Sequence, residues 1–368
     1  MCEVTMWRRR VLAALVAMLA LGGRAAWAQE WMFAVSGDSR NCGDVVMPAI
    51  AAGVIQDGAK FYWHLGDFRA MYAVDDDYKG APKVVGLVPY QHHAWDDFIH
   101  QQLGPFGKLP VYLVRGNHEQ VGKSRDDYVE KFTPWLDQAA IREQRQKDGA
   151  GEASVQSYYH WIQGGVDFIT LDNASGSSFD TAQMAWLKGV LERASKNSEV
   201  KSVVVGMHAA LPDSLSAGHS MNESPEGTNS GREAYRELAE FRKQTNKPVY
   251  VLASHSHFYM TDVYKTACRI EKGQDVLPGW IVGTAGAVRY RLPEEYSTAA
   301  TAMTDVYGYL LGHVAEDGSV RFEFKQIREE DVTAATSERY KRELIHHCFV
   351  ENRSNSVPAG APKPPKCP

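Results

Sequence analysis

The chain has 368 residues, of which 44% are hydrophobic and 23% are charged, and its formal net charge is −5 at pH 7. This composition is that of a globular protein with a sizeable core, not of a disordered or fibrous chain. A mildly acidic chain lacks the basic surplus that binding to nucleic acid or to an anionic membrane requires. We therefore expect neither as a partner.

Residues 1–28 have the three parts of a secretory signal peptide. A basic segment at 7–10 precedes an apolar stretch at 11–21, and an Ala-x-Ala cleavage signal follows at 26–28. The apolar stretch is too short to cross the ~30 Å of hydrocarbon in a bilayer. The prediction is a secreted or periplasmic protein with no membrane span after cleavage.

The remaining elements alternate between strand and helix patterns. Strands are predicted at 31–36, 61–65, 111–115, 203–207 and 249–254, and helices at 49–55, 94–103, 180–194 and 233–242. Asp180 and Gln183 predict a capping box at the start of the third helix. Such alternation indicates an α/β fold with a mostly parallel sheet. Near the end, 304–314 and 319–327 predict a β-hairpin.

Three further segments differ in composition from the predicted strands and helices. Residues 138–156 and 212–231 are polar and read as surface insertions. The second closely follows His208, so it either borders a substrate pocket or is a passive connection. The proline-rich tail, 357–368, should be an extended strap or disordered.

Removal of the signal peptide leaves four cysteines, namely Cys42, Cys268, Cys348 and Cys367. An even number in an oxidising compartment predicts two disulfides, with three possible pairings. Cys348 and Cys367 are close in sequence and flank the tail, which favours that pair. Cys42 is then left to bond with Cys268.

Five short polar motifs follow the five predicted strands in order. They are Gly37-Asp38, Gly66-Asp67, Gly116-Asn117-His118-Glu119, His208 and His255-Ser256-His257. Side chains at the carboxyl ends of parallel strands converge in one crevice. Oxygen and nitrogen ligands of these kinds suit two adjacent divalent or trivalent ions rather than a structural zinc. The candidate metal ligands are Asp38, Asp67, Asn117, His208, His255 and His257.

Taken together, these motifs resemble those of the calcineurin-like metallophosphoesterases, and most closely the purple acid phosphatase-like branch. The matching elements run from Trp31 to about Tyr290. The resemblance implies a layered αββα sandwich of mixed β-sheets, with the metal site at the C-terminal ends of the strands. This domain should span 29–330, with a C-terminal helix and the proline-rich tail over 331–368.

The resemblance also implies a role for each motif residue. Asp38 and His257 would hold the first metal, Asp67 would bridge both metals, and Asn117, His208 and His255 would hold the second. His118 would contact phosphate or protonate the leaving oxygen. The implied activity is acid-phosphatase-like hydrolysis of small-molecule or protein-borne phosphate esters by a metal-activated hydroxide. The two ions would be drawn from Fe, Mn and Zn.

The chain departs from the family pattern around the first metal. Many members have Asp-x-His at the first motif, where this chain has Arg40, and the purple branch has Tyr where this chain has Ala70. The first metal therefore lacks an obvious fourth protein ligand, and water or Asn41 would complete its coordination. No iron–tyrosinate colour is expected unless Tyr72 contacts this metal. Arg40 is predicted to clamp a substrate phosphate, which its planar fork suits.

Two rival functions are open at this point. Gly37-Asp38-Ser39 resembles the nucleophile block of GDS-type serine esterases, but the Asp-x-x-His that these need occurs only at Asp97–His100, too early in the chain. Arg40 also suits a non-catalytic binding protein on a phosphoesterase fold. The remaining histidines considered, His64, His92, His93, His346 and His347, are expected to be structural or solvated.

Overall fold

Strands and helices alternate along the chain in the computed structural model, which describes residues 30–79, 86–150, 154–216, 219–292 and 302–356. The predicted signal peptide and proline-rich tail lie outside these ranges. The strands are β1 (Trp31–Ser36), β2 (Tyr62–His64), β3 (Val111–Leu113), β4 (Tyr159–Gln163), β5 (Val166–Thr170), β6 (Ser202–Gly206), β7 (Val249–Ala253), β8 (Tyr259–Thr261), β9 (Gly279–Val282), β10 (Ala302–Met303), β11 (Tyr307–Val314) and β12 (Val320–Ile327). The α-helices are α2 (Gly43–Gln56), α3 (Asp76–Lys79), α4 (Leu87–Asp97), α5 (Arg125–Leu136), α6 (Ala139–Lys147), α7 (Thr181–Lys196), α8 (Pro225–Thr245), α9 (Ala267–Glu271), α11 (Ala334–Arg339) and α12 (Arg342–His346).

The strands form two mixed sheets. The first has the order β12-β11-β1-β2-β3, in which β1, β2 and β3 run parallel. The second has the order β10-β8-β9-β7-β6-β5-β4, in which β5, β6, β7 and β9 run parallel. The predicted hairpin is confirmed, because β11 and β12 pair antiparallel along their whole length. The predicted αββα sandwich is the fold observed.

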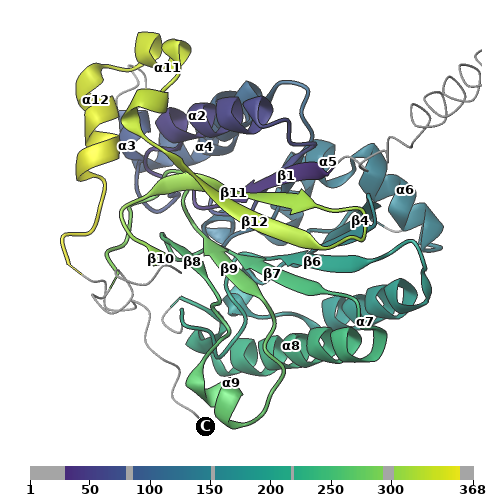
Figure 1. The fold of residues 1–368 in the computed structure, drawn as a ribbon. Helices are drawn as coiled ribbons and strands as arrows, with labels where there is room; N and C mark the ends of the chain where they lie inside the picture. Colours follow the sequence, from purple (N-terminus) through teal and green to yellow (C-terminus); the bar gives the residue numbers. More distant parts are fainter. Residues whose placement is uncertain (1–29, 80–85, 151–153, 217–218, 293–301, 357–368) are drawn as a thin grey trace, which may run out of the picture. The chain divides into compact units, whose positions relative to one another are not determined.

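The two sheets face each other through a layer of aromatic rings. Phe33 of β1 lies 4.9 Å from Phe168 of β5, ring centre to ring centre, and Phe61 lies 5.1 Å from the same ring. Figure 1 shows the helices on the outer faces, with α2, α3 and α4 against the first sheet and α7 and α8 against the second. In β5 and β6 every residue is buried, as expected for strands covered on both faces.

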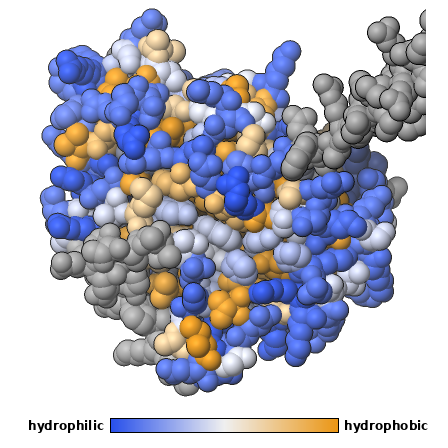
Figure 2. Space-filling view, viewed as in Figure 1, coloured by the Kyte–Doolittle hydropathy of each residue, from blue (hydrophilic) through white to orange (hydrophobic). Residues whose placement is uncertain are grey.

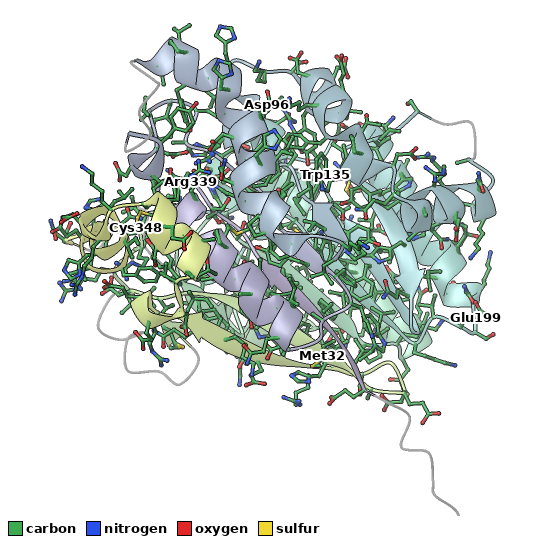
Figure 3. All side chains as sticks on the ribbon, turned by 90° about the horizontal axis from the view of Figure 1, so that it is seen from above. Met32, Asp96, Trp135, Glu199, Arg339 and Cys348 are labelled. Atoms are coloured by element: carbon green, nitrogen blue, oxygen red, sulfur yellow. A yellow bond between two sulfur atoms is a disulfide. The ribbon has the colours of Figure 1, made fainter. Side chains whose placement is uncertain are left out.

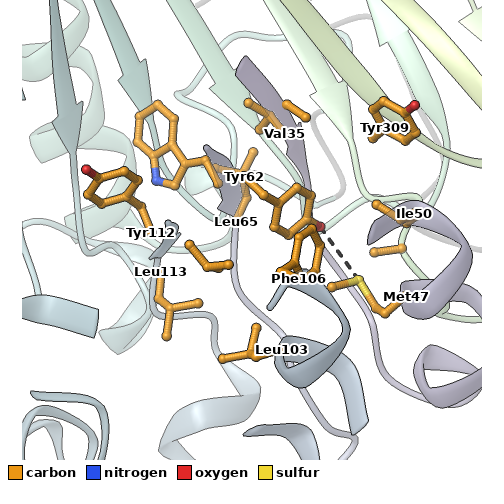
Figure 4. Close-up of a cluster of buried hydrophobic side chains, with 14 of the residues drawn as sticks. Val35, Met47, Ile50, Tyr62, Leu65, Leu103, Phe106, Tyr112, Leu113 and Tyr309 are labelled. Atoms are coloured by element: carbon orange, nitrogen blue, oxygen red, sulfur yellow. Dashed lines mark hydrogen bonds between the residues drawn. The ribbon is translucent and has the colours of Figure 1, made fainter. Parts of the chain in front are cut away.

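Tyr62 joins the first sheet to its covering helices (Figure 4). Its ring stacks on Phe106 at 4.5 Å, and its hydroxyl donates to Met47 Sδ of α2 at 3.6 Å. Val35, Ile50 and Leu65 surround this contact and are fully buried. This contact fixes α2 against the first sheet, and with it the loop between β1 and α2.

Several helices differ from the sequence prediction in extent. Helix α2 begins at Gly43, with Pro48 inside it, instead of after Pro48. Residues 98–103, predicted as α-helix, form a π-helix, η1 (Phe98–Leu103), that continues α4. The polar segments predicted as insertions contain α6 and the start of α8. Their low apolar content hid the helical pattern.

The predicted capping box at α7 is half right. Asp180 caps the helix by accepting from the Gln183 backbone N–H at 2.8 Å. The Gln183 side chain, however, bonds to the backbone of Asp172 and not to that of Asp180.

Both favoured cysteine pairings are wrong, because Cys42 is bonded to Cys348, 306 residues away. Cys42 precedes α2, and Cys348 lies in the short helix η7 (His347–Glu351) that follows α12. Figure 3 shows Cys348 in the yellow C-terminal segment beside the purple α2, where Tyr340 also donates to Asp44 at 2.9 Å. Closeness in sequence was a poor guide, since the packing of these helices brings the two Cα atoms to 5.7 Å.

The part of the chain that the structure describes contains no helix long and apolar enough to cross a membrane. On the face drawn in Figure 2, apolar residues occur in small groups between hydrophilic ones.

The Cys42–Cys348 bond yields a stability prediction. Peptide mapping without reductant should find the two cysteines in one cross-linked fragment. Reduction should lower the free energy of unfolding in urea by about 2–4 kcal/mol, because the unfolded chain loses a long-range constraint. The double variant C42A/C348A should unfold like the reduced wild type and should not respond to reductant. An unchanged urea midpoint on reduction of the wild type would contradict this.

His160 yields a pH prediction. Burial lowers the pKa of His160, but Asp167 and Asp148, at 2.8 and 2.6 Å from its ring nitrogens, outweigh burial and raise the pKa to about 9. A pKa raised above the unfolded value of about 6.5 stabilises the fold fully below that value, and the stabilisation is lost as pH rises through about 9.

His160→Gln should therefore have a lower free energy of unfolding than the wild type at pH 6. The difference between the two should shrink by about 3 kcal/mol by pH 9.5. Urea unfolding at several pH values measures this, with the exposed His92→Gln as the control. A gap that does not change with pH would show that His160 is neutral in the folded protein.

Candidate metal centre

The five motif loops follow the carboxyl ends of five strands. Gly37-Asp38 follows β1, Gly66-Asp67 follows β2, and the Gly116–Glu119 motif follows β3 in the first sheet. His208 follows β6, and His255–His257 follows β7, in the second sheet. The site therefore lies where the parallel strands of both sheets end.

Asp67 lies at the centre of this cluster. Its Oδ1 is 3.2 Å from His208 Nε2 and accepts from the backbone N–H of His118 at 3.0 Å. Its Oδ2 is 3.4 Å from His118 Nε2 and 3.9 Å from Arg40 Nε. The Asp67 carboxylate thus contacts three residues, His208, His118 and Arg40, each from a different loop of the site.

The side of the cluster around Asp67 Oδ1 brings together four possible metal ligands, from Asp67, Asn117, His208 and His255. His208 Nε2 lies 2.9 Å from Asn117 Oδ1 and 3.0 Å from His255 Nδ1. His208 Nδ1 lies 2.9 Å from Leu65 O, which can only accept, so Nδ1 carries a proton and Nε2 presents a lone pair in the neutral ring. Burial lowers the pKa of His208, but the charge of Asp67 outweighs burial and raises it to about 9, and a cation at Nε2 would take the place of this second proton. Lone pairs that face one another around a common point fit a bound cation. Asp67, His208 and His255 hold donor atoms within 4.8 Å of one another.

The other side of Asp67, where the first metal was predicted, is different. His257 Nε2 lies 3.3 Å from Asp38 Oδ1, and His257 Nδ1 donates to Val288 O at 2.7 Å. The Nε2 lone pair that a metal would use instead accepts from Arg40 Nη2 at 3.1 Å. The residues on this side therefore do not fit an ion while Arg40 is in place.

The two carboxylates are buried and incompletely satisfied. Asp38 Oδ1 and Asp67 Oδ2 have no hydrogen-bond partner, and both residues are fully buried. Burial raises the pKa of Asp67, but the charges of His118, His208 and Arg40 outweigh it and hold the pKa well below its usual range. A buried, ionised carboxylate with an open oxygen is costly unless a cation lies beside it.

The backbone of these loops is strained where it carries the candidate ligands. Asp38, Asp67 and His255 have φ of 60°, 58° and 66°, in the left-handed region that side chains seldom adopt. Gly66 also has positive φ, but Gly37 serves close packing, because a Cβ there would lie 2.6 Å from Ser254 Oγ. The loops therefore turn at the ligand residues themselves.

Glu119 holds two of the loops together. Its carboxylate accepts the backbone N–H groups of Asp67, Phe68 and Gly116 at 2.8–2.9 Å. Burial and the charge of Asp67 raise the pKa of Glu119 to about 7, against the lowering effect of these bonds. Glu119 thus positions the second and third motifs without facing the cluster itself.

The remaining residues that the sequence analysis singled out lie at the edge of the side where the first metal was predicted. His118 donates through Nδ1 to Ala70 O at 2.6 Å, which leaves Nε2 facing Asp67. Tyr72 reaches toward the site, but its hydroxyl accepts from Arg40 Nη1 at 2.8 Å. Asn41 Oδ1 accepts from the Val288 backbone N–H at 3.3 Å. Among the described residues, neither Tyr72 nor Asn41 lies ready to complete a first metal.

Ser39 is poorly placed to act as an esterase nucleophile. His64 Nδ1 accepts from the Gly66 backbone N–H, so its Nε2 proton points to Ser39 Oγ at 2.9 Å. A base must instead present a lone pair to the nucleophile. Asp97 forms an ion pair with Arg69 and is not associated with Ser39.

His219 and Glu223 were missed by the motif search. Both lie in the segment after His208, and their donor atoms lie within 4.8 Å of one in His255. Burial and the charge of His257 lower the pKa of His219 to about 4. The sequence signal was the position of this segment after His208, which left open whether it borders a pocket or is a passive connection. Tyr290, which stacks on His257 at 4.1 Å, had no signal at all.

Known proteins share this architecture. A seed purple acid phosphatase, PPD1 from yellow lupin (Lupinus luteus), is 15% identical over 90% of this chain, with a TM-score of 0.51. This chain spans 57% of the length of the lupin chain. A dimetal phosphatase from Danio rerio is 11% identical over 80% of this chain and 95% of its own, with a TM-score of 0.47. At 15% identity, the likeness to the lupin enzyme concerns the fold alone.

No curated protein matches the sequence. A family model described as calcineurin-like phosphoesterase, however, matches residues 40–259, which is more than half of the chain and includes Asp67, Asn117, His208, His255 and His257. The chain belongs to the calcineurin-like phosphoesterase family.

Proposed function

We propose that this protein is a secreted, acid-phosphatase-like hydrolase that cleaves phosphate esters with a bound metal ion. One observation carries the proposal. Asp67 Oδ1, Asn117 Oδ1, His208 Nε2 and His255 Nδ1 converge on one point, and a cation bound there would be held by two oxygen and two nitrogen ligands. The family match supports the same chemistry.

These four residues would hold the ion, with Fe, Mn or Zn as the candidates. When bound, such an ion lowers the pKa of a water molecule toward ~7 and neutralises charge on the phosphoryl oxygens. Glu119 would keep the Asp67 and Asn117 loops in register, through its three backbone hydrogen bonds.

His118 and Arg40 are the proposed catalytic residues. His118 presents Nε2 toward the cluster, so a proton carried there could pass to the leaving oxygen. Arg40 brings a permanent positive charge to the same side, where a phosphate dianion would offset it. Both side chains are nearly buried, which strengthens their interaction with a charged substrate.

Secretion is proposed from two independent features. Residues 1–28 have the pattern of a cleavable signal peptide. The Cys42–Cys348 disulfide is of a kind that persists in oxidising compartments.

The rival to this proposal is a non-catalytic binding protein. Arg40 favours it, because the guanidinium contacts His257 where the catalytic resemblance requires a metal ligand. Turnover separates the two functions, since a binding protein has none.

The metal prediction tests the proposed function directly. Purified protein should hydrolyse p-nitrophenyl phosphate, lose this activity on treatment with a chelator, and regain it when Mn²⁺ or Zn²⁺ is returned. Asp67→Asn should lose metal and more than tenfold in turnover, or over about 1.4 kcal/mol, because the central carboxylate loses its charge.

Asp96→Asn is the matched control, since this exposed carboxylate lies outside the site and should leave activity unchanged. Activity in the wild type that survives chelation would reject a metal-dependent mechanism.

His118→Ala tests proton donation. The variant should keep its metal but hydrolyse alkyl phosphates ~10²–10⁴ times more slowly, while p-nitrophenyl phosphate, whose leaving group needs no proton, should suffer less. His93→Ala, an exposed histidine, should behave as wild type. An equal loss for both classes of ester would assign His118 to substrate binding instead.

A further inference from the structure

Arg40 fills the side of the centre where the first metal ion was expected. Its Nη2 lies 3.1 Å from His257 Nε2, and its Nε lies 3.9 Å from Asp67 Oδ2. Asp38 Oδ1, the remaining ligand expected there, lies 3.3 Å from the same His257 nitrogen. The guanidinium therefore lies among the three groups expected to hold that ion.

The contact with His257 excludes an ion on chemical grounds. His257 Nδ1 donates to Val288 O, so Nε2 is the only lone pair of the ring, and it accepts from Arg40. One lone pair cannot accept a hydrogen bond and bind a metal at the same time. A guanidinium also stays protonated, so it cannot become a ligand itself.

Arg40 is held where it lies and does not reach the site as a flexible surface side chain. It is 8% exposed, and Tyr72 accepts from its Nη1 at 2.8 Å. Its backbone is anchored on both sides, because the Asp38 carbonyl accepts from Ala287 N–H at 2.8 Å and Cys42 is joined to Cys348. Displacing the guanidinium would break its hydrogen bonds with Tyr72 and His257.

The balance of charge in the centre also argues against a second ion beside Arg40. Two carboxylates, Asp38 and Asp67, face the centre, and together they balance one divalent ion. Arg40 already adds a positive charge beyond that balance. A second divalent ion beside Arg40 would lie against this fixed cation, and the further carboxylate near the centre, that of Glu223, lies beside His255.

We propose that this centre holds a single resident metal ion, at Asp67, Asn117, His208 and His255, and that the guanidinium of Arg40 takes the position and the charge of the second cation. The inference rests on the proposed metal-dependent function. A phosphate ester would then bind between an ion and a guanidinium, and the guanidinium cannot be removed by a chelator.

The test is the number of ions bound by the full mature chain. Metal-free protein is titrated with Mn²⁺, the bound metal is counted by mass spectrometry, and the electron paramagnetic resonance spectrum is recorded. Wild type should bind one ion per chain and give the six-line spectrum of an isolated Mn²⁺ ion. Arg40→His, which supplies a ligand in place of the cation, should bind a second ion and give the spectrum of an exchange-coupled pair.

Three further variants locate the ion. His257→Ala should keep one ion per chain, whereas His208→Ala should weaken its binding at least tenfold. Arg232→His is the matched control, because Arg232 pairs with Asp213 outside the centre and the same substitution there should add no ion. Circular dichroism checks that each variant is folded, and the His257→Ala and His208→Ala pair remains decisive if Arg40→His does not fold.

Two ions per chain with a coupled spectrum in the wild type would overturn the inference and leave the proposed function standing. One ion that is lost with His257→Ala but kept with His208→Ala would also overturn it, because the ion would then occupy the other side. Absence of any bound ion, together with turnover that resists chelation, would instead reject the proposed function and the inference with it.

Discussion

The burial of two ionised carboxylates at the junction of the sheets is the constraint on which this structure depends. Asp38 and Asp67 are fully buried, and each keeps an oxygen without a hydrogen-bond partner. Removing a carboxylate from water is costly, so positive charge must collect around it. Arg40, His118 and His208 supply part of that charge in this chain, and the converging donor atoms leave a place for more. The buried carboxylates of this fold therefore require positive charge at the site.

The sandwich meets this requirement by bringing the ends of parallel strands from two sheets together. The first sheet contributes the carboxylates and Asn117, whereas the second contributes His208, His255 and His257. The left-handed backbone of Asp38, Asp67 and His255 is tolerated because the aromatic layer and the outer helices hold the strands behind them. The four proposed ligands of the ion therefore come from both sheets, Asp67 and Asn117 from the first and His208 and His255 from the second.

Arg40 makes the two sides of the centre unequal. On one side four donors face one another, and on the other the guanidinium fills the space between His257 and Asp67. A fixed guanidinium differs from an ion in one respect that matters for phosphate chemistry. It offers directional N–H groups to the oxygens but does not acidify water as a metal does. In the proposed single-ion arrangement, Arg40 would bind phosphate and the ion would activate water.

The sequence by itself predicted the strands that precede the motifs and named candidate site residues that the structure brings together. The apolar runs before Asp38, Asp67, Asn117, His208 and His255 predicted strands that the structure confirms, because burial on both faces leaves a local signal. Only the tertiary structure decided what depends on contacts distant in sequence. Cys42 bonds to Cys348 because the last helices pack on α2, and His219 reaches His255 because of how its loop folds. Arg40 was predicted to lie beside the first metal, but its hydrogen bond to His257 was not, since motif spacing does not show which atoms a side chain contacts.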